Sequence, residues 1–384
     1  ELEAFHPRNS CLSSAYPRMI KACSEMGTTL YSLRWSSVLY EERLSQGQRA
    51  GEHRADHPGT VFLLPVTLRL HSPWHMLHSL VPAYAQAQTD ERYRLLPKQR
   101  GPPALVIVDQ DLDKDRHIWD KVLGEPDSRI GSLDFLLQLV SPLQYELLAE
   151  IRGPRCYEHA VWGHELMLYS GGGWVDHTHV HAFVAAARFL IGASKLPART
   201  ALGRGLLLVE RRNATSWGRW IDNFPAVLVV AESWAARHQD LLGWVHSVDL
   251  AEISITEQLR LAAGVRLMFG AHGDGLSWST FMGQGGALLE AVPARDMGFQ
   301  ACIEGIDTNP WGIFGGLARL ANQTHVCWLN AASNIRPSAL DEVDVFQWGW
   351  RQMNMHVSLE KFEHYLSAAV QRVHQYDVGL ASVH

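Results

Sequence analysis

The sequence predicts an α/β protein built from two domains, each with a mostly parallel sheet. Short, continuous apolar runs recur along the chain and end at charged residues, as strands of a buried parallel sheet do. Segments with helical spacing separate these runs, which is the alternation that parallel sheets require. The length of 384 residues exceeds what a single hydrophobic core usually supports. We therefore predict domains over residues 1–175 and 176–350, followed by a helical segment over 351–384.

Strand and helix patterns follow one another in the first domain. Residues 60–70 (TVFLLPVTLRL) favour a strand, and residues 71–84 favour the helix that follows it. Residues 102–111 (PPALVIVDQD) and 153–163 (GPRCYEHAVWG) predict two further strands. Between them, residues 133–140 (LDFLLQLV) have helical spacing. The first domain is therefore predicted to consist of strand–helix units.

The same alternation continues beyond the glycines at 171–173, which predict a hinge or linker. Residues 177–192 favour a helix, and residues 357–373 have the apolar spacing of a closing helix. Continuous apolar runs between these helices predict strands at residues 205–212, 226–230, 244–250, 265–270 and 287–292. This order predicts a doubly wound domain, in which ligands bind outside the carboxyl ends of the strands.

The composition is that of an ordinary globular protein, with 47% hydrophobic residues, 19% charged residues and a net charge of -6. Such a surface does not on average attract nucleic acid or an anionic membrane, so we expect neither as a partner. No apolar stretch reaches the roughly 18 residues that a membrane-spanning helix requires. A membrane contact is therefore expected only through an anchor outside this sequence.

The cysteines show no CxxC pair and no spacing typical of zinc, so buried free thiols are one interpretation. Asn-x-Thr sequons at Asn213 and Asn322 would be glycan acceptors in a secretory compartment, although such triplets also arise by chance. If the compartment is oxidising, the disulfides to test first are Cys302–Cys327 and Cys11–Cys23.

A glycine-rich turn follows the strand predicted at residues 265–270. It has the sequence AHGDGL, in which Gly273 and Gly275 allow backbone N–H groups to approach an anion near the start of a helix. A diphosphate is the expected ligand of such a turn at the carboxyl end of a strand. The alternative is a tight connection without a ligand, because glycines also serve that purpose.

Two arginines and a glutamate extend this candidate site. Arg211 ends one predicted strand and Arg219 follows it, and guanidinium groups can form paired hydrogen bonds with phosphate oxygens. A surface cluster paired with Glu210 and Asp222 is the alternative. Glu290 is predicted at the end of another strand, where a carboxylate can bridge two ribose hydroxyls or can instead cap a helix or form a salt bridge.

One histidine of the first domain is a candidate general base. His75 lies at the junction between a predicted strand and helix, and a neutral imidazole can accept a proton from a sugar hydroxyl. A structural histidine is the alternative, because the chain has 20 histidines. The acidic residues at 109–115 resemble the DxD motif of metal-dependent nucleotide-sugar enzymes, but they also have the pattern of a solvated surface. We expect no metal site.

Together, these segments resemble glycosyltransferase family 61, which includes plant xylosyltransferases and the EGF-domain and O-mannose N-acetylglucosaminyltransferases. Residues 71–84 are similar to the family's Asn-x-x-His segment, 153–163 to its Cys-aromatic strand and 209–223 to its Arg...Arg-x-Ile-x-Asn block. The closest similarity covers residues 254–293, with the family's Ser-x-x-Glu-Gln helix, His-Gly-Ala-Gly-Leu loop and Glu strand. Three residues depart from the family pattern, namely Ser72, Asp274 and Trp278.

The resemblance implies a GT-B fold, in which two Rossmann-like domains face a cleft and the C-terminal helix can cross back. It implies an inverting transferase that moves a xylosyl, arabinosyl or N-acetylglucosaminyl group from a UDP-sugar to a glycan or glycoprotein hydroxyl in the Golgi or endoplasmic reticulum. No metal or other cofactor is implied. The expected donor-binding residues are Arg211, Arg219, Asn223, Gly270, His272, Gly273, Gly275, Leu276 and Glu290.

The general base is expected to be His75 first and Asp274 second. A carboxylate at Asp274 is unfavourable beside a diphosphate unless it is protonated, paired or turned away. Glu257 and Gln258 are expected to hold the loop from the preceding helix rather than to contact substrate. Two alternatives stay open: an inactive carbohydrate-binding protein with the same fold, and a GDP-fucose-type transferase.

Overall fold

The chain divides into two compact units, Glu1–Leu166 and Met167–His384, each with its own mostly parallel sheet. This confirms the α/β class. The computed structural model describes residues 8–12, 57–66, 77, 81, 104–109, 145–147, 155–162, 177–190, 204–211, 220–294, 302–310, 312–335 and 353–381.

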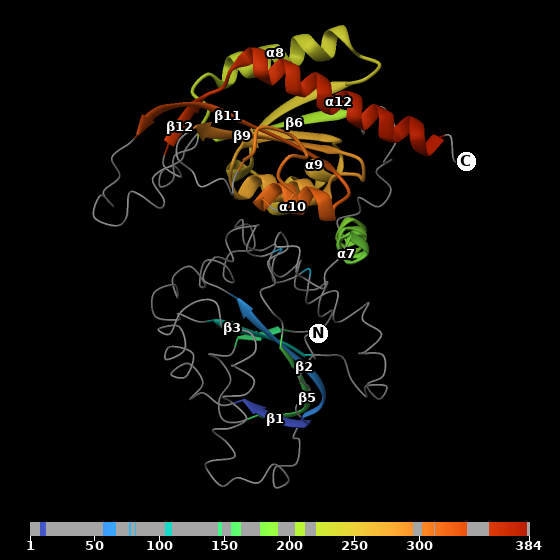
Figure 1. Cartoon of the computed structure of the whole chain (residues 1–384). Helices are drawn as coiled ribbons and strands as arrows, with labels where there is room; N and C mark the ends of the chain where they lie inside the picture. The colour runs from blue at the N-terminus through green and yellow to red at the C-terminus, as the bar shows by residue number, and fades with distance from the viewer. Residues whose placement is uncertain are drawn as a thin grey trace. The chain divides into compact units, whose positions relative to one another are not determined.

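The sheet of the first unit has the strand order β1-β5-β2-β3-β4 (Figure 1). Parallel pairing joins β5, β2, β3 and β4, and β1 lies antiparallel to β5. The strands predicted at 60–70, 102–111 and 153–163 are confirmed as β2, β3 and β5. The helix predicted at 133–140 lies outside the described residues. The strand bounds are β1 (Arg8–Leu12), β2 (His57–Val66), β3 (Ala104–Asp109), β4 (Tyr145–Leu147) and β5 (Arg155–Trp162).

The sheet of the second unit has the order β10-β11-β9-β8-β6-β7, and β12 pairs with β11. Its parallel strands β7, β6, β8, β9 and β11 follow the order 2-1-3-4-5 when numbered along the chain, which is a doubly wound topology. The order reverses between β6 and β8, so this pair forms the topological switch point. The strand bounds are β6 (Gly205–Glu210), β7 (Trp244–Asp249), β8 (Leu267–Ala271), β9 (Ala287–Ala294), β10 (Gly305–Ile306), β11 (Thr324–Ile335) and β12 (Met353–His356).

Helices cover both faces of the second sheet, with α8 and α12 on one face and α9 and α10 on the other (Figure 1). A 3-10 helix, η5 (Asp274–Phe281), follows β8 and packs against α7, α9 and α10. The predicted helices at 177–192 and 357–373 are confirmed as α7 and α12. α12 packs against α8, β9 and β11 of its own unit. The helix bounds are α7 (His177–Leu190), α8 (Phe224–Arg237), α9 (Ile255–Ala263), α10 (Ile313–Leu320) and α12 (Leu359–Ala381).

One predicted strand is wrong, because residues 226–230 lie in the middle of α8. Pro225 lies in the first turn, where its fixed φ angle suits a helix and its missing N–H costs no hydrogen bond. The buried residues Phe224, Val227 and Ala231 recur at helical spacing. A five-residue apolar run is too short to distinguish a strand from a buried helix segment.

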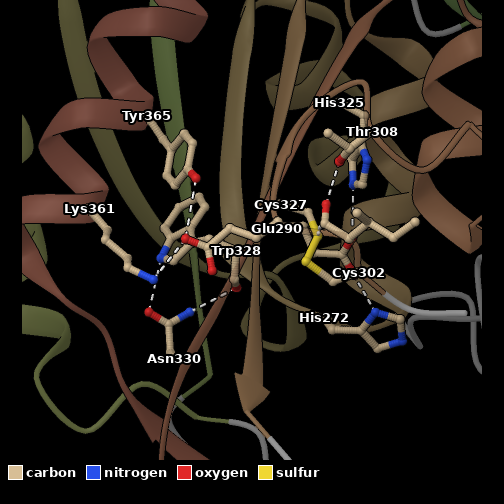
Figure 2. The surroundings of a disulfide bond; sticks show 12 residues. His272, Glu290, Cys302, Thr308, His325, Cys327, Trp328, Asn330, Lys361 and Tyr365 are labelled. Atoms are coloured by element: carbon tan, nitrogen blue, oxygen red, sulfur yellow. Dashed lines mark hydrogen bonds and ion pairs between the residues drawn. A yellow bond between two sulfur atoms is a disulfide. The ribbon is translucent and has the colours of Figure 1, made fainter. Parts of the chain in front are cut away.

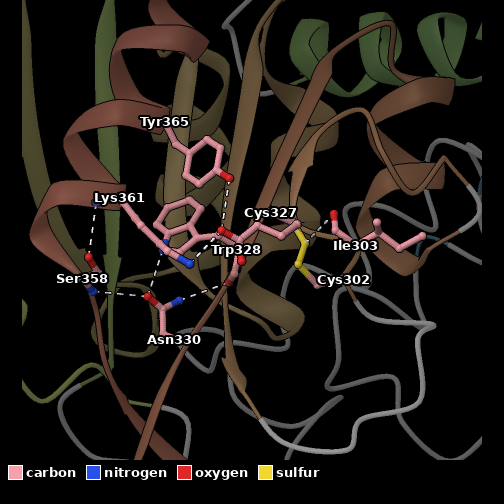
Figure 3. A network of polar contacts seen from close by, with 9 residues as sticks. Cys302, Ile303, Cys327, Trp328, Asn330, Ser358, Lys361 and Tyr365 are labelled. Carbon is pink, nitrogen blue, oxygen red and sulfur yellow. Dashed lines mark hydrogen bonds and ion pairs between the residues drawn. A yellow bond between two sulfur atoms is a disulfide. The ribbon is translucent and has the colours of Figure 1, made fainter.

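Aromatic side chains fill the core beneath α12. Phe269 of β8 stacks on Trp328 of β11 with ring centroids 5.7 Å apart, and Phe362 of α12 lies 4.9 Å from Phe269. All three side chains are fully buried. Figure 3 shows how the start of α12 is held: Asn330 Oδ1 accepts hydrogen bonds from the Trp328 indole N–H at 2.9 Å and from the Ser358 N–H at 3.4 Å.

Candidate functional site

The candidate site lies at the carboxyl ends of β6, β7 and β8. Arg211 directly follows β6, Asp249 is the last residue of β7, and His272 and Asp274 follow β8. Glu210 of β6 is in register with Asp249, so these strands end at the same edge. The switch point between β6 and β8 is where a doubly wound sheet leaves a crevice for a ligand. The fold therefore brings Arg211 and the glycine turn to one place.

Two carboxylates lie close to Arg211. Burial lowers the pKa of the guanidinium, and the charges of Asp274 and Asp249 oppose that change by raising it. Asp249 is itself buried, whereas Asp274 is exposed. The charge of Arg211 is thus offset by two acids, one of them open to solvent.

The backbone of the glycine turn is partly used by the protein itself. The N–H of His272 donates to Ala291 O at 2.9 Å, and the N–H of Leu276 donates to Gly273 O at 2.9 Å. An anion at this turn would therefore have to use the N–H groups of residues 273–275. The N–H of Leu276 is already bonded within the turn and its side chain is buried, so its donor-binding role stays a prediction that these contacts do not support.

Gly270 is required for close packing between neighbouring elements. It lies inside β8, and a Cβ atom there would stand 3.0 Å from Leu276 Cδ2 and 3.1 Å from Val209 Cβ. Such distances are tighter than ordinary van der Waals contact. The glycine therefore lets β8 approach β6 and the start of η5, and its contact with a ligand stays a prediction.

Glu290 and two histidines form a buried cluster, which we call the Glu290 clamp. Its members are His272, Glu290 and His325. Oε1 of Glu290 pairs with His272 Nδ1 and Oε2 pairs with His325 Nε2 at 2.8 Å (Figure 2). Burial by itself raises the pKa of Glu290, but the charges and hydrogen bonds of the two histidines lower it to about 2. The carboxylate is therefore ionised and fully enclosed.

The clamp changes the role predicted for Glu290. β9 continues to Ala294, so Glu290 lies within the strand rather than at its end. Both carboxylate oxygens have histidine partners and the residue has no exposed surface, so a ribose has no access to it. His272 is also buried, with its ring edge-on to Phe314 at 5.1 Å. The clamp holds the base of the glycine turn instead of presenting groups to a ligand.

Asn223 likewise has a structural role. Its Nδ2 donates to Val357 O at 2.8 Å, and its Oδ1 accepts from the Val357 N–H at 2.9 Å. This reciprocal pair joins the start of α8 to the segment between β12 and α12. The side-chain amide is used in that contact, and the donor-binding role of Asn223 stays a prediction.

Gln258 and Trp278 connect the segments on either side of α9 near the candidate site. Gln258 Nε2 donates to Leu250 O at 2.7 Å and to Ile253 O at 3.1 Å, and its Oε1 accepts the indole N–H of Trp278. The amide thus ties the turn after β7 to η5, as expected from its place before the glycine turn. Glu257 lies on the surface, with an oxygen 3.7 Å from Arg260 Nη1. The Trp278 side chain is fully buried in the core.

His75, Arg219 and Cys23 lie outside the described residues, as does most of the acidic run at 109–115. Cys302 and Cys327 form a disulfide with Cα atoms 5.9 Å apart, which confirms that predicted bridge (Figure 2). Among the residues that the structure describes, no group of three or more His, Cys, Asp or Glu side chains could hold a metal ion. Within the same part of the chain, every helix is too short or too polar to cross a membrane.

Sequence reasoning missed His325 and Asp249. His325 directly precedes the apolar run 326–329 of β11, and Asp249 is the acidic last residue of β7. An ionisable residue in such a run is a usable signal of a buried polar contact. Comparison with known protein families gives no match, and comparison with curated proteins gives none either.

Proposed function

We propose that this protein is an inverting glycosyltransferase that uses a UDP-sugar, with its two units in a GT-B arrangement. The observation that carries the proposal is the position of Arg211 and the 273–275 turn at the switch point of the second sheet. Doubly wound sheets bind nucleotides in the crevice at this point. The motif resemblance to glycosyltransferase family 61 supports the same assignment.

In the proposed reaction, a base removes the proton of an acceptor hydroxyl while its oxygen attacks the anomeric carbon of the donor sugar. The new C–O bond forms opposite the diphosphate, and the bond from the anomeric carbon to the diphosphate oxygen breaks, which inverts the configuration. UDP leaves with the electron pair of that bond, and Arg211 stabilises its charge. His75 is the first proposed base, and the exposed Asp274 is the second.

Asp249 and Asp274 place a requirement on the donor site. Because they offset Arg211, a diphosphate bound by Arg211 alone would meet more negative than positive charge. We therefore assign Arg219 as the second cation. The Glu290 clamp fixes the start of the glycine turn, which would hold the diphosphate together with the two arginines.

The proposed compartment is the lumen of the endoplasmic reticulum or Golgi. The Cys302–Cys327 disulfide supports this location, because such bonds persist mainly in oxidising compartments. The proposed acceptor is a hydroxyl of a glycan or glycoprotein, and the proposed sugar is xylose, arabinose or N-acetylglucosamine.

Calorimetric titration of the full chain with UDP tests the donor site. Arg211→Ala is expected to weaken UDP binding roughly 10- to 100-fold, because a hydrogen bond to a charged group contributes roughly 1.5–3 kcal/mol. Arg260→Ala is the matched control, since it removes an exposed arginine on α9 away from the strand ends. Equal UDP affinity in the two folded variants would remove Arg211 from the site.

Release of UDP from UDP-xylose, UDP-arabinose or UDP-N-acetylglucosamine in the presence of acceptor tests the transfer step. His75→Ala is expected to abolish turnover while the affinity for UDP stays unchanged. Asp274→Ala is measured in parallel as the second candidate. Full turnover in both variants would show that neither residue is the base.

A carbohydrate-binding protein without transfer activity is the second candidate. The exposed Asp274 beside Arg211 favours it, because a carboxylate accepts hydrogen bonds from neutral sugar hydroxyls and repels a diphosphate. Binding of free sugars together with no detectable binding of UDP would favour this candidate over the transferase.

A further inference from the structure

Asn322 lies in the turn between α10 and β11, and its sequon, Asn322-Gln323-Thr324, ends at the first residue of β11. The residue is exposed and has a φ of 54°, a left-handed conformation that asparagine tolerates better than most residues. Its backbone is fixed on both sides, because its N–H donates to Arg319 O at 3.1 Å and its carbonyl accepts from the Gly285 N–H at 2.7 Å. The turn therefore holds its asparagine at the surface in a defined position.

A cavity of about 250 Å³ adjoins this turn. The charged groups in its lining are Arg319 and Asp307, so it offers both donors and acceptors. Such a mixture suits the hydroxyl and acetamido groups of a sugar better than a purely anionic or apolar ligand. The polar residues of the lining are Asp307, Asn309, Arg319, Asn322, Gln323 and His325.

The part of the cavity lining that contains Asp307 is attached to the sheet. The Cys302–Cys327 disulfide joins the 302–310 segment to β11. Asp307 Oδ1 accepts from the His325 N–H at 2.8 Å, and the Asp307 N–H donates to His325 O at 2.7 Å. The same disulfide is typical of the compartment in which asparagine-linked glycans are attached.

We propose that Asn322 is an N-glycosylation site and that the first sugar of its glycan lies against this cavity. The inference rests on the secretory location in the proposed function and is independent of the transfer activity. The donor is an oligosaccharide on a lipid diphosphate. A C–N bond forms between the anomeric carbon and Asn322 Nδ2, the C–O bond to the diphosphate breaks, and the amide loses one proton.

The modified amide keeps one hydrogen, which can retain the contact that Nδ2 makes with Tyr376 Oη at 3.3 Å. Glycosylation therefore does not require α12 to separate from the turn. The glycan would cover the polar cavity and leave the opposite edge of the sheet, where the strands end, accessible. The site is thus compatible with ligand binding at the switch point.

Peptide mapping of the full chain, secreted from eukaryotic cells behind a cleavable signal, tests the attachment. Occupancy is read as conversion of Asn322 to aspartate by a peptide N-glycosidase. Thr324→Ala removes the hydroxyl that the sequon needs, and Thr324→Ser keeps it at the same first position of β11. We expect occupancy in the wild type and in Thr324→Ser, and complete loss in Thr324→Ala and Asn322→Gln. An unmodified Asn322 in protein whose Cys302–Cys327 bridge is formed would overturn the proposal.

Digestion of the native protein tests whether the sugar lies against the cavity. If it does, the glycosidase releases the Asn322 glycan at least several-fold more slowly from the folded chain than from the denatured chain. Arg319→Ala and Asp307→Ala are expected to reduce that protection, while occupancy remains complete. Equal rates of release from folded and denatured chains would overturn the cavity assignment. Because the forced secretion supplies the compartment and UDP binding is measured separately, these outcomes do not depend on the transferase proposal.

Discussion

Glu290→Gln tests how much the charge in the Glu290 clamp contributes to folding stability. Glutamine keeps the shape of the side chain but removes the charge that the two histidines stabilise. The pKa of Glu290 is about 2 in the folded chain, compared with 4.5 for an ordinary glutamate. At about 1.4 kcal/mol for each pH unit, this difference corresponds to about 3 kcal/mol of folding free energy. The side chain is fully buried, so solvent does not screen this contribution.

The sign of the pH dependence follows from the lowered pKa. The unfolded chain binds a proton at Glu290 more readily than the folded chain, so the stabilisation is fully present above pH 4.5. It is lost progressively as the pH falls from 4.5 towards 2. Glu290→Gln should therefore be less stable than the wild type at pH 5, and the difference should shrink as the pH falls below 4.5.

Thermal unfolding of the second unit, followed by tryptophan fluorescence, measures this difference. A loss of about 3 kcal/mol corresponds to a melting temperature lower by roughly 6–12 °C for a unit of this size. Glu304→Gln is the matched control, because Glu304 pairs with Lys361 Nζ at 2.7 Å on the surface, where such a pair contributes about 0–1 kcal/mol. Equal melting temperatures for the two variants at pH 7 would refute the clamp as a major source of stability.

Three further variants test separate parts of the structure. Asn223→Ala should destabilise the second unit by roughly 1–3 kcal/mol in urea unfolding, because the backbone groups of Val357 lose their partner. The affinity for UDP should stay unchanged. Weaker UDP binding by the folded variant would show that Asn223 belongs to the donor site. Trp278→Phe should cost roughly 1–3 kcal/mol, because Gln258 Oε1 is left buried without a donor, and an unchanged melting temperature would contradict this role. Replacing Cys302 and Cys327 together by serine should lower the free energy of unfolding by about 3 kcal/mol, because the unfolded chain gains entropy without the bridge. The variant is compared with the wild type, which is measured with and without reductant. A wild type whose stability does not change with reductant would show that the bridge does not contribute.

The sequence predicts best the elements whose boundaries are chemically marked. β6 ends at Glu210, and β8 ends just before the glycine turn, so their apolar runs have clear limits. The glycine turn and Arg211 could be placed at strand ends for the same reason, and the doubly wound order then brings them together. Residues 226–230 follow Pro225, which suits the first turn of a helix, but the apolar run itself is too short to show the helical spacing of the buried residues over three turns.

The Glu290 clamp could not be predicted from local patterns. His325 follows Glu290 by 35 residues, and the two meet only because β11 pairs with β9 in parallel. The same pairing extends β9 beyond the apolar run, so Glu290 lies within the strand and not at its end. Asn223 shows the same difficulty, since its partner Val357 is 134 residues away. Long-range pairing, which a linear pattern does not contain, decided both roles.

The position of β12 and α12 has a consequence for biosynthesis. Phe269 and Trp328 belong to strands formed by residues up to 335, whereas Phe362, which covers them, is translated later. A nascent chain that has reached β11 therefore displays an apolar sheet face with no helix over part of it. Such a face is prone to association with other unfolded chains. The second unit can cover this part of the sheet only after its final helix has been translated.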